Sequence, residues 1–253
     1  MIILLQMNVK FEDICYLLPL RICIVGPMQV GKSTFLINFL MNFEKVTNIK
    51  HTDRQINVQF FYNSTSSLRS AKEAIQGKSC FIDIEFYNGL PTTEQIESFN
   101  ATQEFDRLII LEDSINSIRG QSVSYLSELS SFVTNSRHYG ISIICIFHEF
   151  PFGGSSARLT FEKTFIRNAT CVVLFENLCT SQQTKLFMSR IGINYEDFES
   201  VCKIATKICK LDKENGVHSN PAIVINLDVR QNFSDKLHRI ALDIFNRWLI
   251  VKQ

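Results

Sequence analysis

The amino-acid sequence predicts an α/β fold in which a mostly parallel central sheet is covered by helices on both faces. Strand-like runs rich in β-branched and aromatic residues alternate with longer segments of helical character. Several of these runs are apolar throughout, as in ISIICIF at 141–147, which is typical of a parallel strand buried on both sides. The chain has 253 residues, 45% of them hydrophobic, which suits a single domain with its own core over residues 1–253.

The predicted elements follow one another along the chain. Strands are expected at 21–26, 56–62, 80–87, 107–111, 141–147, 170–175 and 221–229. Helices are expected at 32–43, 68–76, 91–99, 121–136, 157–167, 180–190, 195–208 and 234–250. In the helix at 91–99, Thr92 or Thr93 is expected as a cap and Glu94 as a first-turn acid. Residues 1–16 are expected to form an N-terminal arm or an edge strand, and residues 231–253 to contain the C-terminal helix.

The composition argues against several classes of protein. The formal net charge of +1 provides no overall field to hold nucleic acid, so DNA binding would need local basic patches or a ring of subunits. The apolar N-terminal run MIILLQM is too short to span a bilayer and lacks the features of a signal peptide, and no later run reaches the length of a membrane span. None of the eight cysteines forms a C-x-x-C pair, which argues against a zinc site and a disulfide framework and for a reducing, intracellular compartment.

Residues 26–33, GPMQVGKS, match the phosphate-binding pattern G-x-x-x-x-G-K-[S/T] between a predicted strand and a predicted helix. Gly26 and Gly31 allow the tight turn that points backbone N–H groups at a β-phosphate. Lys32 is expected to bridge the β- and γ-phosphates, and the Ser33 hydroxyl to bind Mg²⁺. The sequence therefore predicts a site for ATP and Mg²⁺. Its residues are Gly26, Pro27, Met28, Gln29, Val30, Gly31, Lys32, Ser33 and Thr34.

A buried strand that ends in two acids, RLIILEDS at 107–114, is the second predicted part of this site. We expect Glu112 to hold Mg²⁺ together with Ser33, and Asp113 to orient or deprotonate the attacking water. A shift by one residue would give the metal to Asp113 and leave no adjacent base, which would favour phosphate transfer or slow hydrolysis. Two solvated acids at the end of a strand are the structural alternative.

Two strand candidates, at 56–62 and 80–87, separate the phosphate-loop strand from the acid-bearing strand in the sequence. An inserted strand between those two is the layout of the additional-strand P-loop ATPases. That class also places a polar residue at the end of the next strand as a sensor of the γ-phosphate. Here the strand at 141–147 ends at His148, which can donate to a γ-phosphate oxygen whether neutral or protonated.

These features resemble the DNA-packaging ATPases of poxviruses, other large eukaryotic DNA viruses and Polinton-like integrated elements, which belong to the FtsK/HerA superfamily. The resemblance covers about residues 17–229 and rests on LPLRICIVGPMQVGKSTFL, FYNGLP, LIILEDSIN, NSRHYGISIICIFHEFPF and RNATCVVLFEN. It implies a RecA-like fold and ATP hydrolysis coupled to sequence-independent movement of double-stranded DNA into a capsid. It also implies a homo-oligomeric ring, capsid proteins as partners, and a location in the host cytoplasm or nucleus where virions assemble.

The sequence departs from this family at three positions. The metal-binding acid is usually aspartate, whereas here it is Glu112, and the sensor is usually an amide residue, whereas here it is His148. Lys163 stands where an arginine is expected, so Arg158 and Arg167 are the candidates for an arginine finger that acts on a neighbouring subunit. Each of these two arginines could also be an ordinary surface charge.

Four lysines at roughly helical spacing form the remaining candidate feature: Lys203, Lys207, Lys210 and Lys213. They would form a solvated helix face, or contact the phosphate backbone of DNA from the pore of a ring. Two other functions stay open on the sequence alone. A small-molecule or nucleotide kinase shares the phosphate loop but needs no adjacent water-activating acid, and a non-catalytic scaffold would bind nucleotide to hold a partner.

Overall fold

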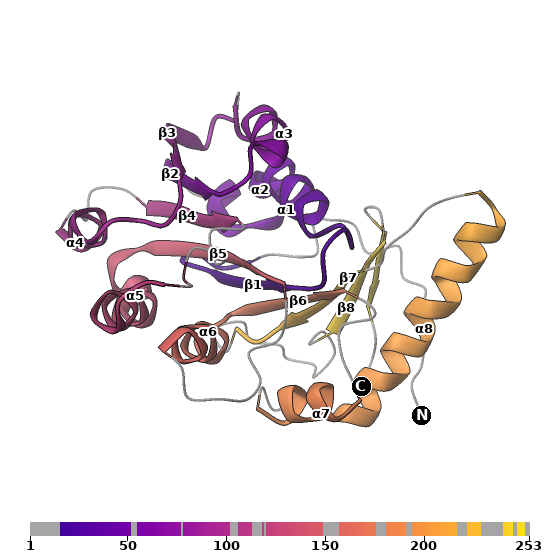
Figure 1. Ribbon diagram of the computed structural model, residues 1–253. Helices are drawn as coiled ribbons and strands as arrows, with labels where there is room; N and C mark the ends of the chain where they lie inside the picture. The colour runs from indigo at the N-terminus through magenta and orange to yellow at the C-terminus, as the bar shows by residue number, and fades with distance from the viewer. Residues whose placement is uncertain are drawn as a thin grey trace.

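The computed structural model describes residues 16–51, 55–76, 78–101, 106–112, 118, 120–148, 157–175, 181–190, 194–216, 222–228, 240–244 and 247–250. A single sheet runs through this part of the chain, with helices on both of its faces (Figure 1). This arrangement confirms the predicted α/β class with a mostly parallel sheet.

The sheet contains nine strands among the described residues. They are β1 (Arg21–Val25), β2 (Ile56–Tyr62), β3 (Phe81–Asn88), β4 (Asp106–Glu112), β5 (Ile141–Phe147), β6 (Cys171–Phe175), β7 (Ala222–Asn226), β8 (Ile240–Ile244) and β9 (Arg247–Ile250). Their order across the sheet is β3-β2-β4-β5-β1-β6-β7-β8-β9. β1 to β6 pair in parallel, whereas β7, β8 and β9 are added antiparallel. β1, β5 and β6 are buried along their whole length, which is why their sequences are continuous apolar runs.

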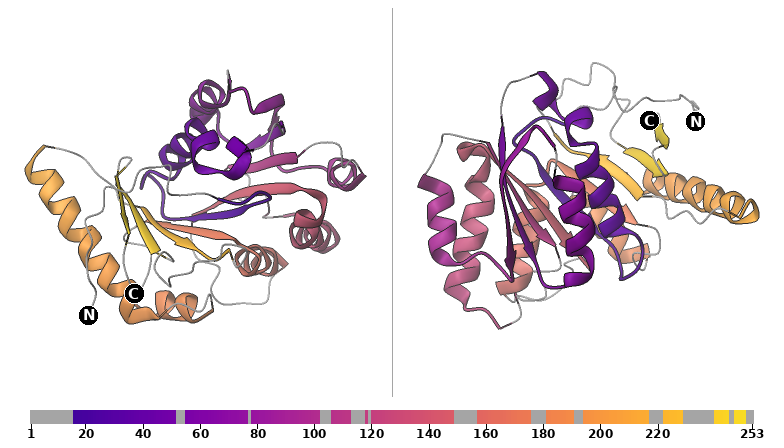
Figure 2. Two further views of the ribbon diagram at one scale, coloured as in Figure 1. Left: turned by 180° about the vertical axis from the view of Figure 1, so that it is seen from behind. Right: turned by 90° about the horizontal axis from the view of Figure 1, so that it is seen from above.

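The described helices pack in two layers. They are α1 (Lys32–Met41), α2 (Phe43–Val46), α3 (Thr65–Ile75), α4 (Thr93–Ala101), α5 (Val123–Asn135), α6 (Ala157–Arg167), α7 (Ser181–Arg190) and α8 (Tyr195–Glu214), with short 3₁₀ segments η2 (Asn48–His51) and η4 (Ser136–Tyr139). α1, α2 and α3 lie on one face of the sheet, and α4, α5 and α6 lie on the other (Figure 2). Each layer covers its own apolar core, because the strands present alternate residues to the two faces.

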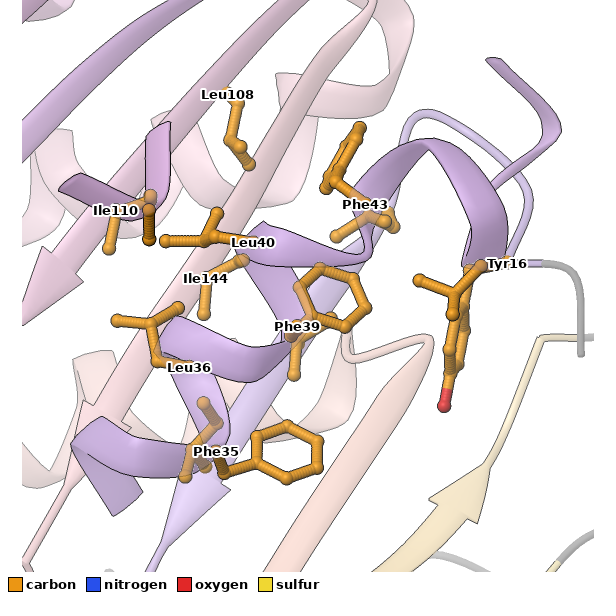
Figure 3. Close-up of a cluster of buried hydrophobic side chains, with 14 of the residues drawn as sticks. Tyr16, Phe35, Leu36, Phe39, Leu40, Phe43, Leu108, Ile110 and Ile144 are labelled. Carbon is orange, nitrogen blue, oxygen red and sulfur yellow. The ribbon is translucent and has the colours of Figure 1, made fainter. Parts of the chain in front are cut away.

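α1 follows the predicted phosphate loop and is anchored to the sheet by its apolar face (Figure 3). Leu36 and Leu40 are buried and point toward Ile110 and Ile144 of the sheet. A row of aromatic rings continues this contact along the helix: Phe35, Phe39, Phe43 and Tyr16. Each fully buried side chain of this size stabilises the fold by roughly 1.5–3 kcal/mol relative to exposure. The helix therefore provides a rigid base for the loop that precedes it.

Thr92 caps α4, as the sequence predicts. Its hydroxyl accepts a hydrogen bond from the N–H of Gln95 at 3.2 Å, and the Gln95 side chain accepts one from the N–H of Thr92 at 2.8 Å. This reciprocal pair is a capping box, which satisfies two N–H groups that the helix itself cannot. Glu94 lies in the first turn, where its negative charge interacts favourably with the helix dipole.

The predicted C-terminal helix at 234–250 is wrong where the structure describes this segment. Ile240–Ile244 and Arg247–Ile250 are strands, and they extend the sheet beyond β7. Apolar residues in this segment fit a strand as well as a helix, and pairing with β7 satisfies backbone groups along an edge that would otherwise be open. Of the predicted N-terminal arm, residues 1–15 lie outside the described residues, while Tyr16 forms an isolated bridge with Thr47.

The strand that separates β1 from β4 in space is β5, which follows both of them in the chain. We expected the inserted strand to come from 56–62 or 80–87, but β2 and β3 lie on the outer side of β4. Since β2 already occupies one side of β4, the strand that returns from β4 through α5 pairs on its other side. The end of β5 therefore lies at the centre of the sheet edge.

Candidate functional site

The carboxyl ends of β1, β5 and β4 lie next to one another at one edge of the sheet. Gly26 follows β1, His148 follows β5, and Glu112 is the last residue of β4. The parallel pairing of Val25 with Phe147 keeps the ends of β1 and β5 level. The fold thus brings to one edge the three segments that the sequence predicts as parts of one site.

The phosphate loop is tied to β5 and closely packed around Gly26. The N–H of Gly26 donates to the carbonyl of Phe147 at 3.1 Å. A Cβ atom on Gly26 would lie 2.9 Å from Cγ2 of Val30 and 3.2 Å from Cβ of Phe175, which is too close for any larger residue without a shift of the loop. Gly31 has φ +97°, a left-handed conformation that glycine adopts at little cost. Both glycines of the motif are thus required by the geometry.

The other residues of the loop differ in what they expose. Met28 is 70% exposed, and Gln29 is exposed with φ 64°. Val30 is half-buried and packs against the apolar core that α1 covers. Ser33 is half-buried and Thr34 is exposed in the first turn of α1.

Lys32, the first residue of α1, is buried and turned back toward the loop that precedes it. Its Nζ donates to the carbonyl oxygens of Gly26 at 2.6 Å and Pro27 at 2.5 Å. The same Nζ lies 3.2 Å from Nδ1 of His148. An ammonium can only donate, so Nδ1 is the acceptor in this contact.

Glu112 is buried, with 2% of its surface exposed, and lies beside Tyr62 of β2 in the parallel ladder. A carboxylate in such a place has to be paired, hydrogen-bonded or bound to a cation. Glu112 is therefore not a solvated acid at the end of a strand, which removes that alternative for this residue. Asp113 lies outside the described residues, so its role and the division of labour between the two acids stay predictions.

The two candidate arginines lie at opposite ends of α6. This helix leaves the edge where β5 ends and returns to the edge where β6 begins. Arg158 is in its first turn, and its side chain is outside the described residues; Arg167 is its last residue and is exposed. They are nine positions apart in the helix, a separation of roughly 14 Å along its axis. Arg158 therefore lies on the side of its own phosphate loop, and Arg167 on the side away from it.

The predicted lysine row lies on α8, which stands at the β7–β8 side of the molecule (Figure 1). Lys203, Lys207 and Lys210 are exposed, and Lys213 has a side chain outside the described residues. Lys203 Nζ forms a surface ion pair with Glu199 at 3.3 Å, a contact that contributes little to stability in water. The row is thus accessible, and a contact with DNA stays a prediction.

The cysteines of the described strands are reduced and apolar in character. Cys23 and Cys145 face each other across β1 and β5, and burial raises the pKa of both thiols well above its usual value. Burial also raises the pKa of Cys171 to about 12. These residues therefore act as small hydrophobic side chains. In the described part of the chain, no group of three or more histidine, cysteine and acidic side chains could hold a metal ion. Within the same limits, no helix is both long and apolar enough to cross a membrane.

Two contacts at this edge were not predicted. Phe175, at the end of β6, backs Gly26, but nothing in the sequence marks that this strand lies beside β1. Lys32 and His148 were each predicted as site residues, but their direct contact depends on β5 lying next to β1. Both contacts follow from the order of the strands in the sheet, and this order cannot be read from the sequence.

Comparison with known proteins gives similarities in structure. No family model and no curated protein matches the chain. Among solved structures, the chain is similar to "EssC (ATPases 2 and 3)" from Geobacillus thermodenitrificans, with 15% identity, a TM-score of 0.44, and coverage of 66% of this chain and 34% of that one. It is also similar to a structure described as the cytoplasmic domain of EssC, with 16% identity, a TM-score of 0.41, and coverage of 66% and 32%.

A third similar structure is EccC (ATPases 2 and 3) of Thermomonospora curvata in complex with a signal sequence peptide. The identity is 13%, the TM-score 0.40, and the coverage 64% of this chain and 30% of that one. The chain thus spans about a third of the length of these proteins. With identities of 13–16% and TM-scores below 0.5, these similarities say nothing about the activity of this chain.

Proposed function

We propose that the protein is an ATP-hydrolysing motor that translocates double-stranded viral DNA into a capsid. The observation that supports an ATP site is the common edge of β1, β5 and β4. A closely packed phosphate loop, a buried carboxylate at Glu112 and the imidazole of His148 all lie there. Strand ends at such an edge are where open α/β sheets bind their ligands.

Each residue has a distinct role in this proposal. Backbone N–H groups of the loop and the ammonium of Lys32 bind phosphate oxygens. The Ser33 hydroxyl and the Glu112 carboxylate are oxygen donors, the kind that Mg²⁺ prefers, and these two residues would hold the ion. When bound, Mg²⁺ offsets charge on the β- and γ-phosphates. Asp113 orients the attacking water, and His148 donates to the γ-phosphate.

The DNA-moving part of the proposal is supported by the sequence motifs that resemble packaging ATPases. A ring of identical subunits would let Arg158 or Arg167 reach the ATP of a neighbour, where an arginine stabilises charge at the transferring phosphoryl group. The exposed lysines of α8, Lys203, Lys207 and Lys210, would contact phosphates without reading bases. Such a motor would work in the host cytoplasm or nucleus, where virions assemble, with capsid proteins as partners.

ATP turnover with and without double-stranded DNA tests this function. We expect hydrolysis that DNA stimulates, that is lost in Lys32→Ala and that is sharply reduced in Asp113→Asn. Lys45→Ala is a matched control, because Lys45 is an exposed lysine of α2, at the far end of α1 from the loop. Phosphate that appears on a small-molecule acceptor instead of water would identify a kinase and contradict the motor.

A nucleotide-binding scaffold is the second candidate. Two observations favour a scaffold over a kinase. Glu112 and His148 depart from the residues usual in the packaging ATPases, and the Lys32 ammonium is turned toward the carbonyl oxygens of its own loop. A scaffold would bind Mg²⁺–ATP tightly and release no phosphate, even at protein concentrations that form oligomers and in the presence of DNA. That result would replace hydrolysis by binding as the function of this edge.

A further inference from the structure

The ammonium of Lys32 makes at least three contacts within its own chain. Two are to carbonyl oxygens of the loop, at Gly26 and Pro27, and the third is to Nδ1 of His148. An ammonium has three N–H donors, so these contacts are enough to use all of them. The side chain is 6% exposed, so water is a minor competitor for these donors.

The position of His148 relative to Lys32 is fixed by the backbone. β5 pairs in parallel with β1, and the N–H of Gly26 donates to the carbonyl of Phe147, the residue before His148. The base of the phosphate loop is thereby tied to the backbone that precedes His148. Nε2 of the His148 ring is shielded from solvent.

We propose that His148 is a positioning residue that holds the Lys32 ammonium against the phosphate loop and so competes with phosphate for this lysine. Each N–H that Lys32 donates to a phosphate oxygen has to be withdrawn from a partner within the chain. The carbonyls of Gly26 and Pro27 belong to the backbone, whereas the imidazole of His148 is a side-chain partner that a substitution can remove. This inference rests on the proposed nucleotide site. It adds that the contact between His148 and Lys32 weakens the binding of ADP, the product of hydrolysis.

Binding of Mg²⁺–ADP isolates the competition, because ADP has no γ-phosphate for His148 to contact. His148→Leu removes the acceptor, whereas His148→Gln keeps one in its side-chain carbonyl. We expect His148→Leu to bind Mg²⁺–ADP about tenfold more tightly than the wild type, at the lower end of what a hydrogen bond from a charged donor contributes. His148→Gln should stay close to the wild type. His148→Leu should also hydrolyse ATP more slowly, because it has no donor for the γ-phosphate, whereas His148→Gln keeps an amide donor and should stay close to the wild type. Tighter binding of Mg²⁺–ADP together with slower hydrolysis in His148→Leu is a result that a merely structural role would not produce.

The same pair of substitutions in a Lys32→Ala background shows whether the effect passes through the lysine. We expect His148→Leu to have no effect on Mg²⁺–ADP affinity there, because the competing ammonium is absent. An equal gain in both backgrounds, or a folded His148→Leu protein that binds Mg²⁺–ADP no more tightly than the wild type, would overturn the proposal. Thermal unfolding of each variant shows that it is folded.

The protonation of the ring tests the contact on the wild-type protein without any variant that could misfold. At about pH 8, where imidazoles in general are neutral, nitrogen-15 NMR of labelled histidines should show His148 with its proton on Nε2. A proton on Nδ1 would refute the contact with Lys32, whatever the binding data. Absence of any nucleotide binding by the wild type, with the proton on Nε2, would instead refute the proposed function and leave the Lys32–His148 contact standing.

Discussion

Replacing Gly26 by alanine tests whether the close packing of the phosphate loop is needed for nucleotide binding. The added Cβ would lie 2.9 Å from Cγ2 of Val30 and 3.2 Å from Cβ of Phe175. The first distance is shorter than real Cβ contacts and the second atom belongs to a buried strand, so the loop has to move by a few tenths of an ångström. Overpacking of this kind costs about 1–3 kcal/mol.

Two measurements follow from this magnitude. Thermal unfolding of Gly26→Ala should lower Tm by about 2–4 °C for each kcal/mol in a chain of this size. Isothermal titration with Mg²⁺–ADP should show a loss of affinity of tenfold or more, since a shift of a few tenths of an ångström moves the carbonyl of Gly26 and the donors beside it. The loop would then present its N–H groups to the phosphates in a different geometry.

A second substitution, at Val30, shows whether the loss of affinity in Gly26→Ala is caused by the steric clash with Val30. Val30→Ala removes the Cγ2 atom that meets the new Cβ, while the 3.2 Å contact with Phe175 remains. The double variant Gly26→Ala/Val30→Ala should therefore regain part of the lost affinity, although Val30→Ala alone weakens the packing under α1. Wild-type affinity and an unchanged Tm in Gly26→Ala would show that the loop tolerates a Cβ at this position without a shift.

Two further predictions concern local interactions. Thr92→Ala removes one half of the capping box with Gln95 and should cost about 1 kcal/mol in the free energy of unfolding, measured by urea denaturation. Glu97→Ala, at an exposed position of the same helix, is the control, and an equal loss there would contradict the assignment of the cap. Burial raises the pKa of Glu44, but hydrogen bonds, the one from Ser79 foremost, outweigh it and lower the pKa below its ordinary value of 4.5. The carboxylate therefore stabilises the fold above that pH and loses this contribution as the pH falls through the lower pKa. Glu44→Gln should flatten the dependence of Tm on pH below about 4.5, and an unchanged profile would argue against these hydrogen bonds.

The sequence allows the phosphate loop to be predicted because its information is local. Gly26, Gly31 and Lys32 lie within one short segment. Their spacing alone predicts the tight turn of the loop, the close approach of its backbone to a phosphate, and the lysine that binds that phosphate. The positions of β1, β4 and β5 along the chain were also predictable, because buried parallel strands have a distinctive apolar composition.

The arrangement of these strands was not predictable in the same way. β2 and β3 lie between β1 and β4 in the sequence, which suggested one of them as the inserted strand. In the structure β2 pairs with one side of β4, so β5 pairs with the other side and lies next to β1. The contact of Lys32 with His148 depends on that arrangement. The segment 234–250 was misread because its apolar residues fit both periods, and the open edge of β7 decides between them.

Movement along double-stranded DNA distinguishes the proposed motor from other ATPases, and displacement of a triplex-forming strand from linear duplex DNA measures it directly. A motor that tracks along the duplex strips off the third strand as it passes, and the released strand is followed by fluorescence. We expect release that requires ATP and Mg²⁺, does not depend on the sequence of the duplex, and is abolished in Lys32→Ala but not in Lys45→Ala. ATP hydrolysis without displacement of the third strand, at protein concentrations well above that of the DNA, would contradict a DNA-translocating motor.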